Sequence, residues 1–340
     1  MNVESPGRNF FNPHKMSDPS TMSKFMIKLE ESLRSRGLAD SSAKSYILQM
    51  KRLNDGKQFN SFAFLKDIPV IEAFIEKSAE NTQKNYYAAI LSCTKEHATK
   101  STYAKAIKYY ARKFQSVKGS IEAQVDTNDK TETQKENWMT WKEVLEVKDA
   151  LQKQVDAIVL PEDGKIGVVD YDLILRNLVL ALYTYITVRR NKDYMLMKIT
   201  KLKGAESMPS YQNYYDILNQ RFIFNTYKTS KTYGQQIVSI KDNKELLKAI
   251  DAYLKVHQCP KDDMYSFLCH YGGIPFQYDF DITRNLNRTF NKNIGATMLR
   301  HISLSDMYDI DDIKEKAKER KDLADAMGHS VKVQQDYMKH

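Results

Sequence analysis

Residues 173–197 read LILRNLVLALYTYITVRRNKDYMLM, and this stretch indicates how the second half of the chain folds. Leu173 to Val188 is apolar on nearly every side of a helix, which is typical of a helix buried inside a domain. Polar residues follow at once, with Arg189 and Arg190 side by side and Asp193 three residues further on. The stretch therefore predicts the central helix of a domain, with a charged segment directly after it.

The surrounding sequence predicts a domain over residues 138–340 that is mostly helical with a small β-sheet. Thr140 and Glu143 form the T-x-x-E pattern of a capping box, which predicts that a helix begins there. Two strand-like segments, 221–227 and 235–240, flank a polar turn and predict a β-hairpin. Further helices are predicted by apolar positions from Leu246 to Leu254, and over 283–293, 303–320 and 321–327, where Gly328 ends the last.

The first part of the chain has a different character. Residues 1–20 contain three prolines and no apolar period, so we expect a flexible N-terminal arm. Apolar residues recur at helical spacing over 21–118, which predicts a compact all-helical domain. Residues 119–137 contain almost no apolar side chains and are interpreted as an interdomain linker.

Charge is distributed unevenly along the 340 residues, whose net charge is +9. Residues 1–118 hold 20 Lys and Arg against 11 Asp and Glu, whereas residues 119–340 hold 32 of each. A basic first third favours a partner with dense negative charge, above all nucleic acid, although a lysine-rich solvated surface is the alternative. The candidate phosphate contacts lie on the fifth predicted helix: Lys105, Lys108, Arg112 and Lys113.

Several other classes of protein are disfavoured. No apolar run approaches 18 residues and the N-terminus lacks an apolar signal segment, so we expect an intracellular protein without a membrane anchor. The cysteines, Cys93, Cys259 and Cys269, are too few and too scattered for a disulfide framework. Cys269 adjoins His270, but no second pair has zinc-ligand spacing. We therefore expect core or surface thiols and no metal site.

Five motifs follow one another in the second half. Arg190 lies in T-V-R-R-N-K-D, Lys228 in Y-K-T-S-K, Arg300 in M-L-R-H, His329 in M-G-H-S, and Tyr337 follows eight residues later. This order resembles the tyrosine recombinase (phage integrase) family over the whole second domain. The helical first domain and the charged segment after it resemble that family's core-binding domain and interdomain tether.

The resemblance implies a fold and a reaction. It implies a C-shaped clamp of two domains around double-stranded DNA, with Tyr337 attacking the scissile phosphate to give a 3′-phosphotyrosine. Such a covalent intermediate keeps the energy of the phosphodiester, so that religation needs no ATP. Arg190 and Arg300 correspond to the residues that bind the non-bridging oxygens, and His329 to a further hydrogen-bond donor. Neither a metal nor a nucleotide cofactor is implied.

Two assignments have alternatives. Lys228 resembles the family's general acid for the leaving 5′ oxygen, but Lys231 lies on the same turn and is the alternative. Asp193 matches the acidic position that holds the first arginine in place. Its spacing favours Arg190 over the neighbouring Arg189 as that arginine.

The sequence departs from the family pattern at two points. Thr297 occupies the position where the family usually has histidine before the second arginine, and a hydroxyl cannot take a proton at neutral pH as imidazole can. His301 matches a position that is normally structural. Only three residues follow Tyr337, so the segment that many relatives exchange between subunits is expected to be missing.

The resemblance implies site-specific recombination or integration by a homotetramer on two DNA sites, in a protein of the kind that viruses and mobile elements carry. Two other functions remain open. A type IB topoisomerase uses the same residues but relaxes supercoils as a monomer. A DNA-binding protein that has lost catalysis is the other, and Thr297 is the residue that supports it.

Overall fold

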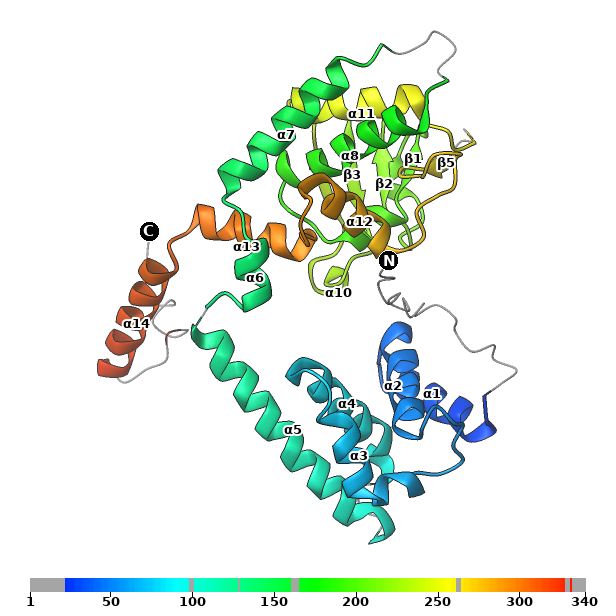
Figure 1. Cartoon of the computed structure of the whole chain (residues 1–340), viewed down its shortest axis with the longest axis vertical. Coiled ribbons are helices and arrows are strands. Elements are labelled where there is room, and N and C mark those ends of the chain that lie inside the picture. The colour runs from blue at the N-terminus through cyan, green and yellow to red at the C-terminus, as the bar shows by residue number, and fades with distance from the viewer. Residues whose placement is uncertain are drawn as a thin grey trace, which may run out of the picture. The chain divides into compact units, whose positions relative to one another are not determined.

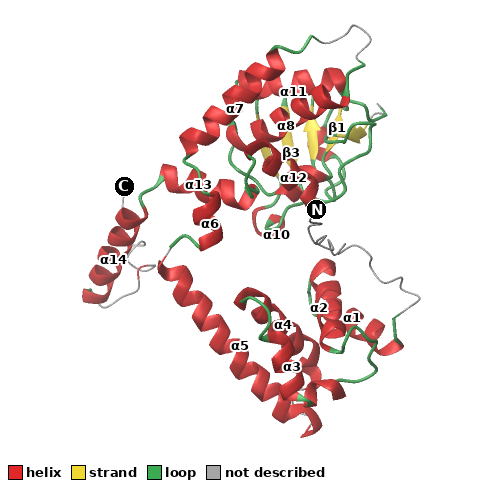
Figure 2. Ribbon diagram, in the orientation of Figure 1, coloured by secondary structure: helices red, strands yellow, loops and turns green. Residues whose placement is uncertain are grey.

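The structure, a computed structural model, describes residues 22–97, 101–127, 129–159, 165–260, 264–327 and 331. The chain divides into two compact units at the bond between Asp129 and Lys130. Each unit has a hydrophobic core of its own. Helices predominate, and one small sheet belongs to the second unit (Figures 1 and 2).

The first unit is helical throughout its described residues. Its helices are α1 (Lys24–Ser35), α2 (Asp40–Leu53), α3 (Ile68–Ile75), α4 (Glu80–Thr94) and α5 (Ser101–Thr127), with short 3-10 turns η2 (Ala63–Lys66) and η3 (Lys95–His97). Both α2 and α5 pack against α4. Buried aromatic rings fill the core, and the Tyr110 hydroxyl satisfies the Leu65 carbonyl at 2.9 Å.

The end of α5 differs from the prediction. Residues 119–137 were interpreted as a linker, yet α5 continues to Thr127 and α6 (Glu132–Asn137) follows, so most of this segment is helical. Val117 packs against the core of the first unit, and the Ser120 hydroxyl donates to Glu80 on α4 at 3.0 Å. These contacts extend the helix beyond the point where the apolar pattern fades.

The second unit is built around α8 (Val168–Thr184), most of whose residues are buried. This confirms the central helix predicted from Leu173 onward. Helix α7 (Trp141–Asp156), α11 (Lys244–Val256) and α12 (Asp279–Phe290) pack against α8. The remaining helices are α9 (Asn191–Met195), α10 (Ser230–Tyr233), α13 (Ala296–Met307) and α14 (Ile310–Ala326), with a 3-10 turn η4 (Ala205–Ser207).

A five-stranded mixed sheet with the order β4-β3-β2-β1-β5 completes the second unit (Figure 2). Its strands are β1 (Lys198–Thr200), β2 (Tyr214–Asp216), β3 (Arg221–Phe224), β4 (Gln236–Ser239) and β5 (Met264–Ser266). Strands β1 and β2 are parallel and the other neighbours antiparallel. The antiparallel pairing of β3 with β4 confirms the predicted hairpin. No helix among the described residues is both long and apolar enough to cross a lipid bilayer.

The prediction of a single helix over 303–320 is wrong, because two helices share this segment. Helix α13 begins earlier, at Ala296, and ends at Met307, and α14 begins at Ile310. Asp309 separates them, because its carboxylate accepts hydrogen bonds from the backbone N–H groups of residues 311 and 312. An aspartate at this position caps the N-terminus of a new helix.

Candidate anion-binding site

Two adjacent arginines lie in the loop that joins α8 to α9, and α12 fixes this loop. The Asn191 side chain donates hydrogen bonds to the Asp279 carbonyl at 2.9 Å and to the Thr283 hydroxyl at 2.8 Å. It also accepts one from the Tyr183 hydroxyl at 2.7 Å. Because Asn191 directly follows Arg190, these three bonds determine where the arginine backbone lies.

Arg189 binds within the protein. Its Nε donates to Asp193 and its Nη1 to Gln236 on β4, each at 2.9 Å. Its guanidinium carbon lies 3.7 Å from the centre of the Phe224 ring and 5.3 Å from that of Tyr227. Arg189 therefore joins the loop after α8 to the β3–β4 hairpin, and its side chain has little capacity left for a ligand.

Asp193 was predicted to hold Arg190, and the structure corrects this. Its carboxylate pairs with Arg189, four residues earlier in the loop before α9. With Arg190 it shares a backbone bond, from the Asp193 N–H to the Arg190 carbonyl at 2.9 Å. Burial raises the pKa of Asp193, and the positive charge and hydrogen bond of Arg189 oppose that rise. Arg190 caps the N-terminus of the short helix α9, and its side chain makes no ion pair with any described residue.

Arg300 approaches the same loop from α13. Its Nε donates to the Val188 carbonyl at 3.0 Å, and its side chain is half-buried. Burial first, and then the positive charge of Arg190, lowers the pKa of Arg300, while the negative charge of Asp193 acts in the opposite direction. Arg190 and Arg300 therefore lie close enough to repel each other.

The cluster of Arg189, Arg190, Arg300 and Asp193 has more positive than negative charge. Its carboxylate is engaged by Arg189, and among the described residues neither Arg190 nor Arg300 forms an ion pair. Two half-buried guanidinium groups without a counter-ion repel each other less once an anion binds between them. Their paired N–H donors match the oxygens of a phosphate or carboxylate, so the arrangement can bind an oxyanion.

The lysines of the hairpin turn are exposed. Between β3 and β4, Lys228 lies two residues before the start of α10 and Lys231 lies within α10. Neither forms an ion pair with a described residue. The Tyr227 hydroxyl closes this turn by donating to the Gly234 carbonyl at 2.9 Å. Because Tyr227 also contacts Arg189, the turn is attached to the arginine loop, and both lysines remain candidates for the general acid.

Thr297 lies in the first turn of α13 and is exposed. It precedes Arg300 by three residues, so the two side chains share one side of the helix. His301, which follows Arg300, is also exposed. The two remaining predicted site residues, His329 and Tyr337, lie outside the described residues.

The four basic residues predicted on α5 have unequal surroundings. Lys105, Lys108 and Arg112 are exposed, and their spacing of three and four residues places them in a row along one face. Lys113 is different, because its ammonium group pairs with Glu72 at 2.5 Å and with Glu76 at 3.6 Å. The hydrogen bond to Glu72 raises the pKa of Lys113, which is thereby committed to a contact inside the first unit.

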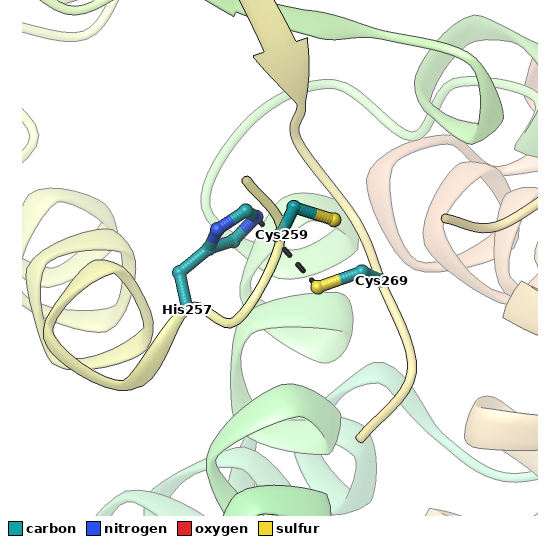
Figure 3. Close-up of side chains that lie close together, drawn as sticks. All are labelled: His257, Cys259 and Cys269. Atoms are coloured by element: carbon teal, nitrogen blue, oxygen red, sulfur yellow. Dashed lines mark hydrogen bonds between the residues drawn. The ribbon is translucent and has the colours of Figure 1, made fainter. Parts of the chain in front are cut away.

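Three residues of metal-ligand type come together elsewhere in the second unit. His257, Cys259 and Cys269 are buried, and one ligand atom from each lies within 4.8 Å of the others (Figure 3). No metal site was predicted, because Cys269 was considered only with its neighbour His270. His257 and Cys259 lie ten or more residues earlier in the chain and were not considered together with it. The H-x-C spacing of the first two was the available signal.

Sequence reasoning also missed the ion pair of Arg189 with Asp193, and two residues that position the arginines, Gln236 and Asn191. The spacing of four residues between Arg189 and Asp193 was a signal for their ion pair, although Arg189 lies in the loop before α9. Gln236 and Asn191 gave no such signal. Their roles depend on which segments the fold brings together.

Comparisons with known proteins give little help. No protein-family profile and no curated protein sequence matches the chain. One solved structure, a crystal structure of XerA recombinase, aligns with 93% of this chain and 93% of its own, at 11% sequence identity and a TM-score of 0.32. A TM-score this low carries no argument for a shared fold or a shared activity.

Proposed function

We propose that the protein cuts and rejoins DNA strands through a tyrosine nucleophile, as a site-specific recombinase or integrase. The observation that carries this proposal is the bond from Arg300, distant in sequence, to the Val188 carbonyl in the loop of Arg190, with neither arginine in an ion pair among the described residues. Two arginines of this kind suit a phosphodiester, whose non-bridging oxygens accept paired hydrogen bonds. The order of the predicted residues, ending in Tyr337, supplies the rest of the proposal.

In the proposed first step, the Tyr337 oxygen attacks the phosphorus of the scissile phosphodiester. A bond forms between phosphorus and the phenol oxygen, whose proton passes to water, and the bond from phosphorus to the 5′ oxygen breaks. The leaving oxygen takes a proton from Lys228 or Lys231. A 5′ hydroxyl of another strand then reverses these steps, so that the number of phosphodiesters is unchanged.

Arg190 and Arg300 act in this scheme by stabilising charge that builds up on the phosphate oxygens. Donors held in place before the reaction need no reorganisation when that charge develops. The bond from Arg300 to Val188 and the three bonds of Asn191 provide such preorganisation. Loss of one such donor typically lowers the rate by about 10²–10³-fold.

The row of Lys105, Lys108 and Arg112 on the first unit is proposed to contact the DNA backbone. Phosphate contacts of this kind hold a protein on the duplex and carry no sequence information. Lys113 is left out of this set because Glu72 neutralises it.

The test is the formation of a covalent adduct. A library of duplexes with random sequence and a nick near the site of attack traps the tyrosine intermediate, since the short cleaved strand diffuses away. Protein–DNA adducts are isolated under denaturing conditions and the trapped sequences are read. We expect an adduct from the native chain and none from Tyr337→Phe. The matched control Tyr308→Phe, at an exposed tyrosine of the second unit, should keep the adduct.

The outcomes separate the alternatives. An adduct that persists in Tyr337→Phe would remove the nucleophile from the proposal. An adduct from a lone subunit that relaxes supercoiled DNA, without joining two sites, would favour a type IB topoisomerase. DNA binding with no adduct from any sequence of the library would favour a binding protein without catalysis.

A further inference from the structure

The second unit contains a buried group of soft ligands far from the arginine loop in sequence. His257 terminates α11, Cys259 follows two residues later, and Cys269 lies beyond β5. Their side chains are at most 6% exposed, and the two thiols are free. Figure 3 shows the imidazole of His257 joined by a dashed line to the sulfur of Cys269, with the Cys259 side chain beside them.

The ligand atoms of this group are close enough together to reach one ion. His257 Nε2 lies 3.7 Å from Cys269 Sγ, and all three ligand atoms lie within 4.8 Å of one another. Zinc bonds of about 2.0–2.1 Å to nitrogen and 2.3 Å to sulfur, at a tetrahedral angle, place two such ligands roughly 3.6 Å apart. The separation of His257 and Cys269 therefore needs almost no adjustment.

We propose that His257, Cys259 and Cys269 bind a zinc-class divalent metal ion. Two thiolates and one imidazole form a soft ligand set, which favours zinc over magnesium or calcium. Three protein ligands leave the fourth tetrahedral position to a water molecule. On binding, each thiol loses its proton, and the proton of the imidazole resides on Nδ1 so that Nε2 has a lone pair for the metal.

The backbone around the group is already held in place. The Cys269 carbonyl accepts from the Tyr171 hydroxyl and its N–H donates to the Tyr253 hydroxyl, each at 3.0 Å. Gly273 packs so closely on the segment between His257 and Cys259 that an added Cβ would lie 2.5 Å from the Gln258 carbonyl oxygen. Two ligand-bearing segments are thus fixed against each other without a metal, which reduces the entropy that binding must overcome.

Two hydrogen bonds compete with the metal. The Cys259 thiol donates to the Gly273 carbonyl at 3.2 Å, and this bond is lost when the thiol gives up its proton. His257 Nε2 lies 2.8 Å from the Ser266 carbonyl, and this contact is available when Nε2 carries the proton. Nδ1, in contrast, is buried and has no hydrogen-bond partner among the described residues. Metal binding replaces the bond to Ser266 with a metal–nitrogen bond.

The consequence for the protein is structural. The ion joins the end of α11 to the segment after β5, which leads into α12. Helix α12 in turn holds Asn191, next to the arginine loop. Metal binding is therefore expected to stabilise the second unit, and this expectation does not depend on any reaction with DNA.

Cobalt(II) is the probe, because its spectrum reports both thiolate ligation and tetrahedral geometry. The full-length, untagged chain is reduced, treated with a chelator, exchanged into chelator-free buffer and titrated with cobalt chloride. We expect one equivalent to produce a sulfur-to-cobalt charge-transfer band and the intense visible bands of a tetrahedral site, and zinc chloride to abolish both. Metal analysis of protein purified without chelator provides a second measurement.

Substitutions assign the ligands. His257→Gln, Cys259→Ser and Cys269→Ser are each expected to weaken cobalt binding by at least 100-fold. Cys93→Ser, at the buried cysteine of the first unit, and His270→Gln, beside Cys269, are the matched controls and are expected to bind as the native chain does.

Three results would overturn the proposal. One is a folded, fully reduced native chain that gives no tetrahedral cobalt spectrum and no rise in Tm with zinc. A second is native binding by all three substituted chains. A third is a Cys259–Cys269 disulfide in the purified protein, with no metal bound after its reduction. If the substituted chains fail to fold, the spectrum and Tm of the native chain decide.

Discussion

Arg189 and Arg190 are neighbours in the chain, yet their side chains have different surroundings. Arg189 pairs with buried Asp193 and stacks on Phe224, whereas Arg190 has no ion-pair partner among the described residues. The first arginine therefore maintains the structure around the loop, and the second is the one available to a ligand.

Replacing each arginine by alanine distinguishes these roles. Arg189→Ala leaves a buried carboxylate without its partner, so the free energy of unfolding is expected to fall by about 3 kcal/mol. Arg190→Ala is expected to change it by less than about 0.5 kcal/mol. Urea denaturation measures both, and the proposed adduct should form about 10²–10³-fold more slowly in Arg190→Ala. Equal losses of stability would contradict the distinction.

Lys148 is expected to make the free energy of unfolding depend on pH. Its side chain is fully buried, its Nζ donates to Gln152 at 3.2 Å, and burial lowers its pKa from 10.5 to about 8. Between these two values the unfolded chain binds more protons than the folded one, so stability rises with pH in that window. Below about pH 8 both states are protonated, and the cost of the buried charge is fully present.

Lys148→Met removes this titration. We expect the native chain to gain roughly 3 kcal/mol or less between about pH 7 and pH 10, and the substituted chain to lack that gain. Urea denaturation at several pH values measures the slope. Equal slopes in the two proteins would show that Lys148 is not the group responsible.

At the level of single residues, the sequence selected residues more readily than their partners. Arg190, Arg300 and Asp193 were all selected, and Arg300 bonds to the Val188 carbonyl in the loop that carries Arg190, while the roles of these residues stay predictions. The pairing of Asp193 with Arg189 was missed because the family pattern, and not the spacing of one helical turn, determined the assignment. Lys113 was selected as a DNA contact because nothing local to α5 reveals Glu72 beside it.

Among the elements, α7 has a beginning that the sequence shows clearly. The Thr140 hydroxyl accepts from the Glu143 N–H at 3.2 Å, and the Glu143 carboxylate accepts from the Thr140 N–H at 2.7 Å. This is the capping box predicted from T-x-x-E, and it is confirmed.

Thr140→Ala removes one half of this capping box. We expect the free energy of unfolding to fall by about 1 kcal/mol, since the orphaned N–H groups at the helix start lose their acceptor. Thermal or urea unfolding measures the loss. Lys142→Ala, an exposed change in the first turn of the same helix, serves as the control and is expected to have almost no effect.

Other elements could not be predicted from the local sequence pattern. Strands β1, β2 and β5 have three residues each, too few to show an alternating pattern, and all of β2 is buried. Only the hairpin, with its polar turn between two apolar runs, was long enough to recognise. The break at Asp309 was missed because no glycine or proline interrupts this segment, and only the cap at the Asp309 carboxylate reveals two helices.

For the molecule as a whole, the two separate cores predict two units that fold alone. Fragments 22–129 and 130–340 are each expected to unfold in one cooperative transition, because each contains a complete hydrophobic cluster. Circular dichroism during heating tests this. A fragment without a transition would mean that its core needs the other unit.

The salt dependence of DNA binding tests the proposed role of α5. If Lys105, Lys108 and Arg112 each contact a phosphate, replacing all three by glutamine should make the slope of log affinity against log salt shallower by roughly 2–3. Lys113→Gln should leave that slope unchanged and lower stability instead, because it unpairs Glu72. An unchanged slope in the triple variant would exclude these contacts.

The hydrogen bond from Arg300 to Val188 spans 112 positions of the chain. The whole sheet and α11 lie within the loop that this single contact closes. Surface turns inside that loop can therefore lengthen or shorten over evolutionary time while both guanidinium groups stay where they are. Relatives of this protein should differ most in size between these two points, and least in the short segments that hold them.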